Sequence, residues 1–118
     1  MSGPEQIWRD ALADGRLILP RETESGRYFF PPRVAAPGNG TSWEWVEASG
    51  RGTVYSVSII HPRPPEQPYN VVLVELAEGP RLMSRIEGVA PDAVTIGMAV
   101  TARIATSADG PLLLFDPV

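Results

Sequence analysis

The sequence predicts a mainly β protein whose larger part is a small antiparallel barrel. The chain has 118 residues, of which 43% are apolar and 20% are charged, so it can bury one modest core. Its 13 prolines and 11 glycines interrupt helices often and favour short strands joined by turns. From residue 43 onward, β-branched and aromatic residues alternate with polar ones at the period of half-buried strands. We therefore expect one domain with an appendage rather than two independent cores.

The barrel is expected to occupy residues 43–118, where turn signals separate the strands. The first expected strand is residues 43–47, in which Trp and Glu alternate. The later expected strands are residues 52–60, 70–77, 81–86, 99–105 and 112–115, with a bend at Gly97 before the fifth of the six. Because these strands can all pair antiparallel, the pattern predicts a closed or nearly closed five-stranded barrel of the oligonucleotide/oligosaccharide-binding (OB) type. A simple sandwich is the alternative.

An N-terminal helix is predicted within residues 1–15. Ser2 and Glu5 form the Ser-x-x-Glu pattern of a capping box. Apolar side chains, among them Trp8 and Leu12, then recur at helical spacing. Since a helix of about three turns is marginal in isolation, its apolar stripe must pack on the barrel or on a partner subunit.

Residues 16–42, called the arm below, lack a clean periodicity. Glycines and prolines break this segment up, so we expect irregular structure with at most a small hairpin. Its distinctive feature is a run of aromatic residues between arginines, namely Arg27, Tyr28, Phe29, Phe30 and Arg33.

Charge and composition argue against several classes of protein. The absence of cysteine excludes disulfides, thiolate nucleophiles and any zinc site built from sulfur. A net charge of −4 and a pI of about 4.9 disfavour nucleic acid as a partner. All ten basic residues are arginine, whose forked donors suit phosphate and carboxylate groups. No stretch approaches the roughly 20 apolar residues that cross a bilayer, and no targeting segment is recognised, so we expect a cytoplasmic protein.

Five segments spread over nearly the whole chain carry a resemblance to a known family. They are residues 27–33 (RYFFPPR), 43–56 (WEWVEASGRGTVYS), 69–76 (YNVVLVEL), 79–82 (GPRL) and 96–100 (IGMAV), of which 50–56 is the most specific. These segments closely resemble the DUF35-type OB-fold proteins that occur beside acyl-CoA enzymes and carry a rubredoxin-like zinc ribbon.

The resemblance implies a zinc ribbon that this sequence cannot complete. Members of the family look alike in having an N-terminal helix, two Cys-x-x-Cys knuckles that bind one zinc ion, and the barrel. The four ligand positions implied here are Glu22, Ser25, Ala36 and Asn39. A carboxylate, a hydroxyl, a methyl group and an amide do not make a structural zinc site. The resemblance therefore implies a degenerate, metal-free zinc-ribbon arm, and no zinc or other cofactor is expected.

The function that the resemblance implies is that of a non-catalytic accessory subunit. Such domains look like partners of thiolases, thiolase-like lipid-transfer aldolases, ketoacyl synthases and MaoC-type hydratases. They dock on the catalytic subunit and help to hold the coenzyme A part of its substrate. We therefore expect a hetero-oligomer in which acyl-CoA is the substrate of the partner, with no nucleic acid and no membrane involved.

The aromatic run of the arm has two competing interpretations. Tyr28, Phe29 and Phe30, with Arg27 and Arg33, could meet coenzyme A or fill a groove on a partner. The same rings could instead form the small core of the arm at the place where zinc would have been. Three contiguous aromatic residues cannot all point inward, so at least one is expected to stay exposed or to contact another chain.

The three tryptophans are interpreted differently from one another. Trp8, on the isolated helix, is a candidate anchor for a partner subunit. Trp43 and Trp45 share one face of a strand, which favours the barrel core or the seam between arm and barrel.

A catalytic constellation is hard to assemble from this sequence. His61 is the single histidine and is expected on a surface loop. Acidic pairs such as Glu22 with Glu24, Glu44 with Asp116, and Glu75 with Glu78 show no motif and are expected to be solvated. The glycines at 50 and 52 precede a strand rather than a helix, which favours turn or bulge glycines over a phosphate loop.

Two further functions are weighed against the accessory role. One is an OB-type module that binds single-stranded nucleic acid, against which the acidic charge argues. The other is a stand-alone acyl-CoA hydratase or thioesterase-like enzyme, for which no nucleophile or base pair is recognised.

Overall fold

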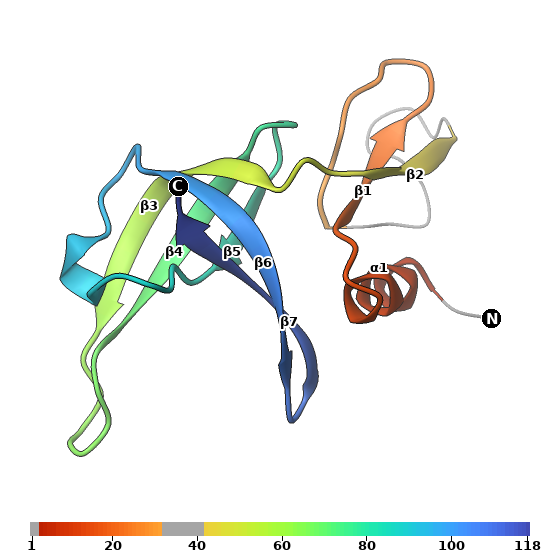
Figure 1. Ribbon diagram of the computed structural model, residues 1–118. Coiled ribbons are helices and arrows are strands. Elements are labelled where there is room, and N and C mark those ends of the chain that lie inside the picture. The colour runs from red at the N-terminus through yellow and green to blue at the C-terminus, as the bar shows by residue number, and fades with distance from the viewer. Residues whose placement is uncertain (1–2, 32–41) are drawn as a thin grey trace. The chain divides into compact units, whose positions relative to one another are not determined.

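Five strands from residue 51 onward form one antiparallel sheet in the computed structural model, which describes residues 3–31 and 42–118. The strands are β3 (Arg51–Ile60), β4 (Tyr69–Leu76), β5 (Arg81–Ser84), β6 (Ala99–Ser107) and β7 (Gly110–Pro117). Their order across the sheet is β5-β4-β3-β6-β7 (Figure 1). Each corresponds to a strand expected from the sequence, with ends that differ by at most two residues.

The sheet curls until its two outer strands meet. Just after β5, Ile86 forms a parallel bridge with Phe115 of β7. The Phe115 N–H donates to the carbonyl of Arg85 at 3.1 Å, and the Glu87 N–H donates to the carbonyl of Phe115 at 2.8 Å. The predicted small OB-type barrel is therefore confirmed, and the sandwich alternative is wrong because a single sheet closes on itself.

A buried amide fixes the chain at this closure. Asn70 on β4 is only 2% exposed. Its Nδ2 donates to the Ile86 carbonyl at 2.9 Å, and its Oδ1 accepts from the Ile86 N–H at 2.8 Å. One side chain thus satisfies both backbone groups of a buried residue that lies beyond the end of the β4–β5 ladder.

The barrel core follows the alternation of β4, whose even-numbered residues are buried. Val72, Val74 and Leu76 are buried, as are residues of other strands of the sheet, such as Val54 of β3 and Phe115 of β7. Full burial of an aliphatic or aromatic side chain of this size contributes about 1.5–3 kcal/mol, so this face provides most of the driving force for closing the sheet.

The two glycines that flank Arg51 have separate steric roles. Gly50 has φ of +82°, a conformation that other residues avoid. At Gly52 a Cβ atom would lie 2.7 Å from Val74 Cγ1 and 2.9 Å from the carbonyl oxygen of Glu75, so β4 approaches too closely for a side chain. The chain then enters β3 rather than a helix, so the prediction against a phosphate loop is confirmed.

The structure divides into two compact units by its internal contacts. The first unit comprises Met1–Ser49, Glu78–Pro80 and Ile104–Leu112. The second unit comprises Gly50–Ala77, Arg81–Arg103 and Leu113–Val118. The first unit contains helix α1 (Pro4–Ala13) and a two-stranded antiparallel sheet of β1 (Ile18–Glu22) and β2 (Trp43–Glu47) (Figure 1).

Helix α1 begins and ends within the range expected. Its N-cap residue is Gly3, without a side-chain capping hydrogen bond, and the Ser2 of the expected capping box lies outside the described residues. Ala11 and Leu12 are buried, whereas Trp8 is half-buried. The helix packs on β1 within the first unit, so part of its apolar stripe is covered by its own chain.

The strand at residues 43–47 belongs to a different sheet from the one expected. We expected it to be the first strand of the barrel, but β2 pairs with β1 in the two-stranded sheet, and the five-stranded sheet begins at Arg51. The partner strand was not expected, because Ile18, Leu19 and Pro20 are buried in succession and show no alternation.

A 3₁₀ turn, η1 (Pro91–Ala93), precedes the bend expected before β6. Gly97 has φ of +91°, which confirms the sharp turn predicted at that position. Within residues 3–31 and 42–118, no helix is long and apolar enough to cross a membrane.

Candidate docking site in the first unit

The arm begins with a hairpin turn held by hydrogen bonds. The Glu22 N–H donates to the Arg27 carbonyl at 2.9 Å, and the Gly26 N–H donates to the Glu22 carbonyl at 2.9 Å. The Ser25 hydroxyl donates to Glu22 Oε1 at 2.6 Å and accepts from the Arg27 N–H at 3.1 Å. Glu22 and Ser25 occupy two of the implied zinc-ligand positions. Here the hydrogen bond between their side chains stabilises the turn.

The donors of the implied metal site do not fit zinc. Only Glu22 among the four positions carries a strong ligand, and its Oε1 accepts a hydrogen bond from Ser25. Ala36 and Asn39 lie outside the described residues. Among the described residues, no group of three or more His, Cys, Asp or Glu side chains is close enough to hold a metal ion.

Phe29 forms an aromatic cluster with the two tryptophans of β2. Its ring lies edge-on to Trp43, with centroids 5.6 Å apart, and Trp43 lies edge-on to Trp45 at 5.0 Å. These are the T-shaped arrangements that aromatic quadrupoles favour, each contributing about 0.5–1.5 kcal/mol beyond the burial of area. The Phe29 N–H donates to the Pro20 carbonyl at 3.0 Å, which places this ring beside the β1–β2 sheet.

Phe30 contacts the helix instead. Its ring centroid lies 5.3 Å from that of Trp8, with the planes inclined at 58°. The adjacent Phe29 and Phe30 therefore have different partners, as expected for neighbours in extended backbone. The Trp8 Nε1 atom is buried and has no hydrogen-bond partner among the described residues.

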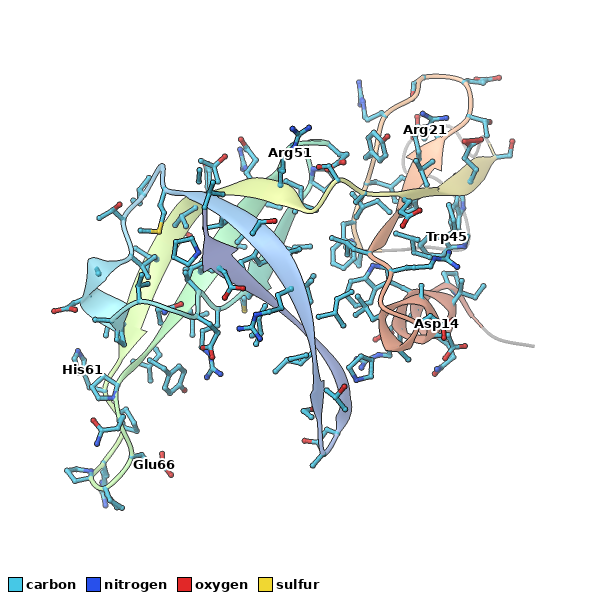
Figure 2. The ribbon with its side chains drawn as sticks, viewed as in Figure 1. Asp14, Arg21, Trp45, Arg51, His61 and Glu66 are labelled. Atoms are coloured by element: carbon cyan, nitrogen blue, oxygen red, sulfur yellow. The ribbon has the colours of Figure 1, made fainter. Side chains whose placement is uncertain are left out.

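Tyr28 lies on the arginine-bearing edge of the hairpin. It forms an antiparallel bridge with Arg21, whose guanidinium carbon lies 5.9 Å from the centre of the Tyr28 ring. Arg21 also donates to Glu44 Oε2 at 2.8 Å, and this hydrogen bond raises the pKa of Arg21 above its already high ordinary value. Arg21 therefore keeps its charge throughout the physiological pH range. Figure 2 labels Arg21 and Trp45 in this unit.

The remaining predicted site residues are less closely grouped. Arg27 follows the hairpin turn and has an exposed side chain, whereas Arg33 lies outside the described residues. Tyr28, Phe29 and Phe30 are all half-buried, so none of the three is wholly withdrawn from solvent. His61, labelled in Figure 2, is exposed at the end of β3 in the second unit, where Asp92 borders the same small cavity of about 330 Å³.

The participation of Trp43 and Trp45 in this cluster was only partly foreseen. Sequence reasoning placed them on one strand face at the barrel core or its seam with the arm, but their ring contacts lie within the first unit. The signal that could have found this is the Glu-rich alternation of residues 43–47, which leaves one apolar face free to cover residues 18–22.

Comparisons with known proteins agree on one family. Residues 45–105, more than half of the chain, match the family model described as the C-terminal OB-fold domain of ChsH2. A DUF35 domain-containing scaffold protein of Methanocaldococcus jannaschii is 35% identical over 101 residues, which cover 80% of this chain and 72% of that protein.

Two further matches connect the fold with named enzymes. The solved structure of an Ltp2-ChsH2(DUF35) aldolase contains a chain that is 36% identical, with a TM-score of 0.86 over 99% of this chain and 96% of that one. A probable enoyl-CoA hydratase alpha subunit of Thermomonospora curvata is 42% identical over 98 residues. This chain covers 31% of the length of that hydratase subunit.

Proposed function

Because the chain belongs to the DUF35 family of ChsH2-type OB-fold domains, we propose that it is a non-catalytic accessory subunit of an acyl-CoA enzyme. The observation that carries this proposal is the likeness over almost the whole chain to the DUF35 part of the Ltp2-ChsH2 aldolase. Reaction chemistry would then belong to a catalytic partner, and this chain would dock on it. The partner that we propose is a thiolase-like or lipid-transfer-type subunit, with a MaoC-type hydratase as the alternative partner.

The arm and helix α1 are the proposed docking site. Trp8, Tyr28, Phe29 and Phe30 bring rigid aromatic surface to one unit while each keeps part of that surface exposed. Large aromatic side chains commonly provide the anchors of protein interfaces, because they bury much area at little cost in side-chain entropy. In this proposal the rings serve both as core of the first unit and as contact surface for the partner.

Arginine side chains near the aromatic run suit the coenzyme A part of the substrate. Arg27 is exposed beside Tyr28, and Arg33 follows in the sequence. Forked guanidinium groups bind phosphate oxygens in pairs, and an aromatic face can stack on an adenine ring. We propose that the arm contributes such contacts to a substrate that is held mainly by the catalytic subunit.

We also propose that the subunit functions without zinc. The hydrogen bonds between Glu22, Ser25 and Arg27 close the turn that a metal would otherwise organise. The ring contacts of Phe29 and Phe30 supply apolar packing for the described part of the arm, which supports a fold that does not rely on a metal.

Co-expression with a thiolase-like or lipid-transfer-type acyl-CoA enzyme subunit from the same genome tests the proposed function. The isolated chain should show no acyl-CoA turnover, whereas the two proteins should co-elute on gel filtration and the partner should gain activity or thermal stability. Equal activity of the partner alone and in the mixture, without co-elution, would show that the chain is not its accessory subunit. Turnover of an acyl-CoA by the pure chain would instead support the enzyme alternative.

A further inference from the structure

The outer face of the barrel sheet carries a group of side chains that the proposed docking site does not use. On β4, Leu73 and Glu75 point away from the core, because the residues between them are buried. Leu73 pairs with Met83 and Glu75 pairs with Arg81 across the β4–β5 ladder. With Tyr55 of β3, these four residues form what we call the outer sheet face, which lies entirely in the second unit.

A β-bulge brings Tyr55 onto this face. The register of β3 against β4 shifts between Val54 and Ser56, so Tyr55 is the extra residue on its strand. The guanidinium carbon of Arg81 lies 3.7 Å from the centre of the Tyr55 ring, and Arg81 Nε donates to Glu75 Oε2 at 2.9 Å. Tyr55 is 46% exposed, yet its ring is held by a neighbour that is itself anchored by an ion pair.

Met83 adds exposed apolar surface beside the Tyr55–Arg81 contact. Its side chain is 73% exposed, the highest value for a large apolar residue within any described strand. It stands in register with Leu73, so the two make a continuous apolar strip across β4 and β5. Tyr, Met and Arg are the residue types enriched at protein interfaces, and a pre-organised aromatic ring loses little entropy when a partner covers it.

We propose that the outer sheet face is a second docking surface, and that its occupant is an uncharged, partly apolar surface of the acyl-CoA enzyme subunit. This inference rests on the proposed function and assigns a further contact surface to the same partner. The charges of the face support this occupant, because Arg81 is already paired with Glu75 and offers no free cation to a phosphate chain. A second copy is disfavoured because two chains of net charge −4 repel each other.

Aspartate substitutions at two similarly exposed residues test this surface. Met83→Asp places a charge on the apolar strip of the outer sheet face, opposite Leu73. Ile96→Asp places the same charge on a residue that is 70% exposed in the turn before β6 and is not one of the five residues of this face. Calorimetric titration should show the Met83→Asp variant binding the enzyme subunit roughly tenfold or more weakly, with the Ile96→Asp variant within about twofold of the unsubstituted chain.

A second variant keeps the test valid if Met83→Asp fails to fold. Tyr55→Ser removes the ring that contacts Arg81 and should also weaken binding about tenfold. The thermal midpoint and circular dichroism check that this variant folds. If either folded variant binds as the unsubstituted chain does, the second docking surface is disproved while the first-unit site stands. If the unsubstituted chain itself does not bind, the proposed function fails with it.

Two other outcomes would replace the occupant. Sedimentation could show that the isolated chain forms dimers and that Met83→Asp dissociates them. This result would assign the face to a second copy and overturn the proposal. Salt-sensitive binding of a fluorescent oligothymidine that is lost with Tyr55→Ser would assign it to single-stranded nucleic acid, with the same consequence.

Discussion

The first and second units are stabilised by different kinds of contact. In the first unit, a few half-buried rings on short elements meet in tilted or T-shaped contacts, and a hydrogen-bonded turn orders the hairpin. In the second unit, many aliphatic side chains alternate into a closed sheet, and a single buried amide fixes the closure. Stability in the second unit thus rests on one alternating sheet face, whereas the first unit combines half-buried rings with a short run of buried aliphatic residues such as Ile18 and Leu19.

This contrast has a functional meaning. A unit whose rings are half-buried retains apolar surface that a partner can cover, at the cost of lower local stability. A closed barrel provides the stable framework to which such a unit can remain attached. The predictions below are ordered by their expected effect on the unfolding free energy of the second unit.

Replacing Asn70 by leucine should have the largest effect. The substitution leaves the N–H and the carbonyl of Ile86 buried without partners, which should cost about 3 kcal/mol or more of unfolding free energy. The measurement is urea unfolding followed by far-ultraviolet circular dichroism. Gln67→Leu, which changes an exposed amide in the β3–β4 loop, should stay within about 0.5 kcal/mol. Equal midpoints for the two variants would show that the closure does not depend on this side chain.

Replacing Gly52 by alanine should have the next largest effect. The new methyl group would meet Val74 and the backbone of Glu75, which cannot retreat without disturbing the β3–β4 ladder. We expect a loss of about 2 kcal/mol in the same unfolding experiment. Gly3→Ala is the matched control, because it introduces the same methyl group where nothing lies within 4 Å. A Gly52→Ala protein as stable as this control would mean that the strands separate without cost.

Replacing Phe29 and Phe30 together by serine should destabilise the first unit and leave the second unit largely unchanged. Both ring contacts of the hairpin are lost, so the amides of β1 and β2 should lose their protection from hydrogen exchange. The second unit should keep its protection within about 0.5 kcal/mol. If these rings are anchors, the binding free energy for the partner or for coenzyme A should weaken by about 2 kcal/mol or more. A collapse of the barrel with unchanged affinity per folded molecule would identify the rings as core alone.

Removing metal should have no effect on either unit. The turn at Glu22 and Ser25 is closed by hydrogen bonds, so a chelator should leave the thermal midpoint unchanged. Elemental analysis of the purified protein should find no stoichiometric zinc. One tightly bound equivalent would contradict this and would direct attention to His61 and the carboxylates.

Local pattern was sufficient for the barrel strands and insufficient for the first sheet. Strands such as β4 could be located because one face is buried and the other exposed, which leaves a period of two in the sequence. β1 was missed because three successive residues are buried, and because its partner β2 lies more than twenty residues away. No local rule relates two such segments, so β2 was assigned to the barrel that follows it in sequence.

The candidate site was predictable in composition but not in its contacts. Adjacent aromatic residues were not expected to share one side of the chain, and the structure gives Phe29 and Phe30 different partners. That the two rings meet Trp43 and Trp8, respectively, depends on tertiary packing of three elements, which sequence spacing does not encode. The roles of Arg27 and Arg33 in binding remain predictions, and Arg33 lies outside the described residues.

The location of the tryptophans gives the molecule a built-in optical reporter. All three occur at positions 8, 43 and 45, so every indole belongs to the first unit and the second has none. Emission excited at the red edge of the absorption band, where tyrosine is silent, therefore follows the first unit, while hydrogen exchange of the β3 and β4 amides follows the second. The edge-on pair at 5.0 Å is also close enough for its electronic transitions to couple. Its split dichroic band would disappear when the hairpin opens, even while the barrel remains folded.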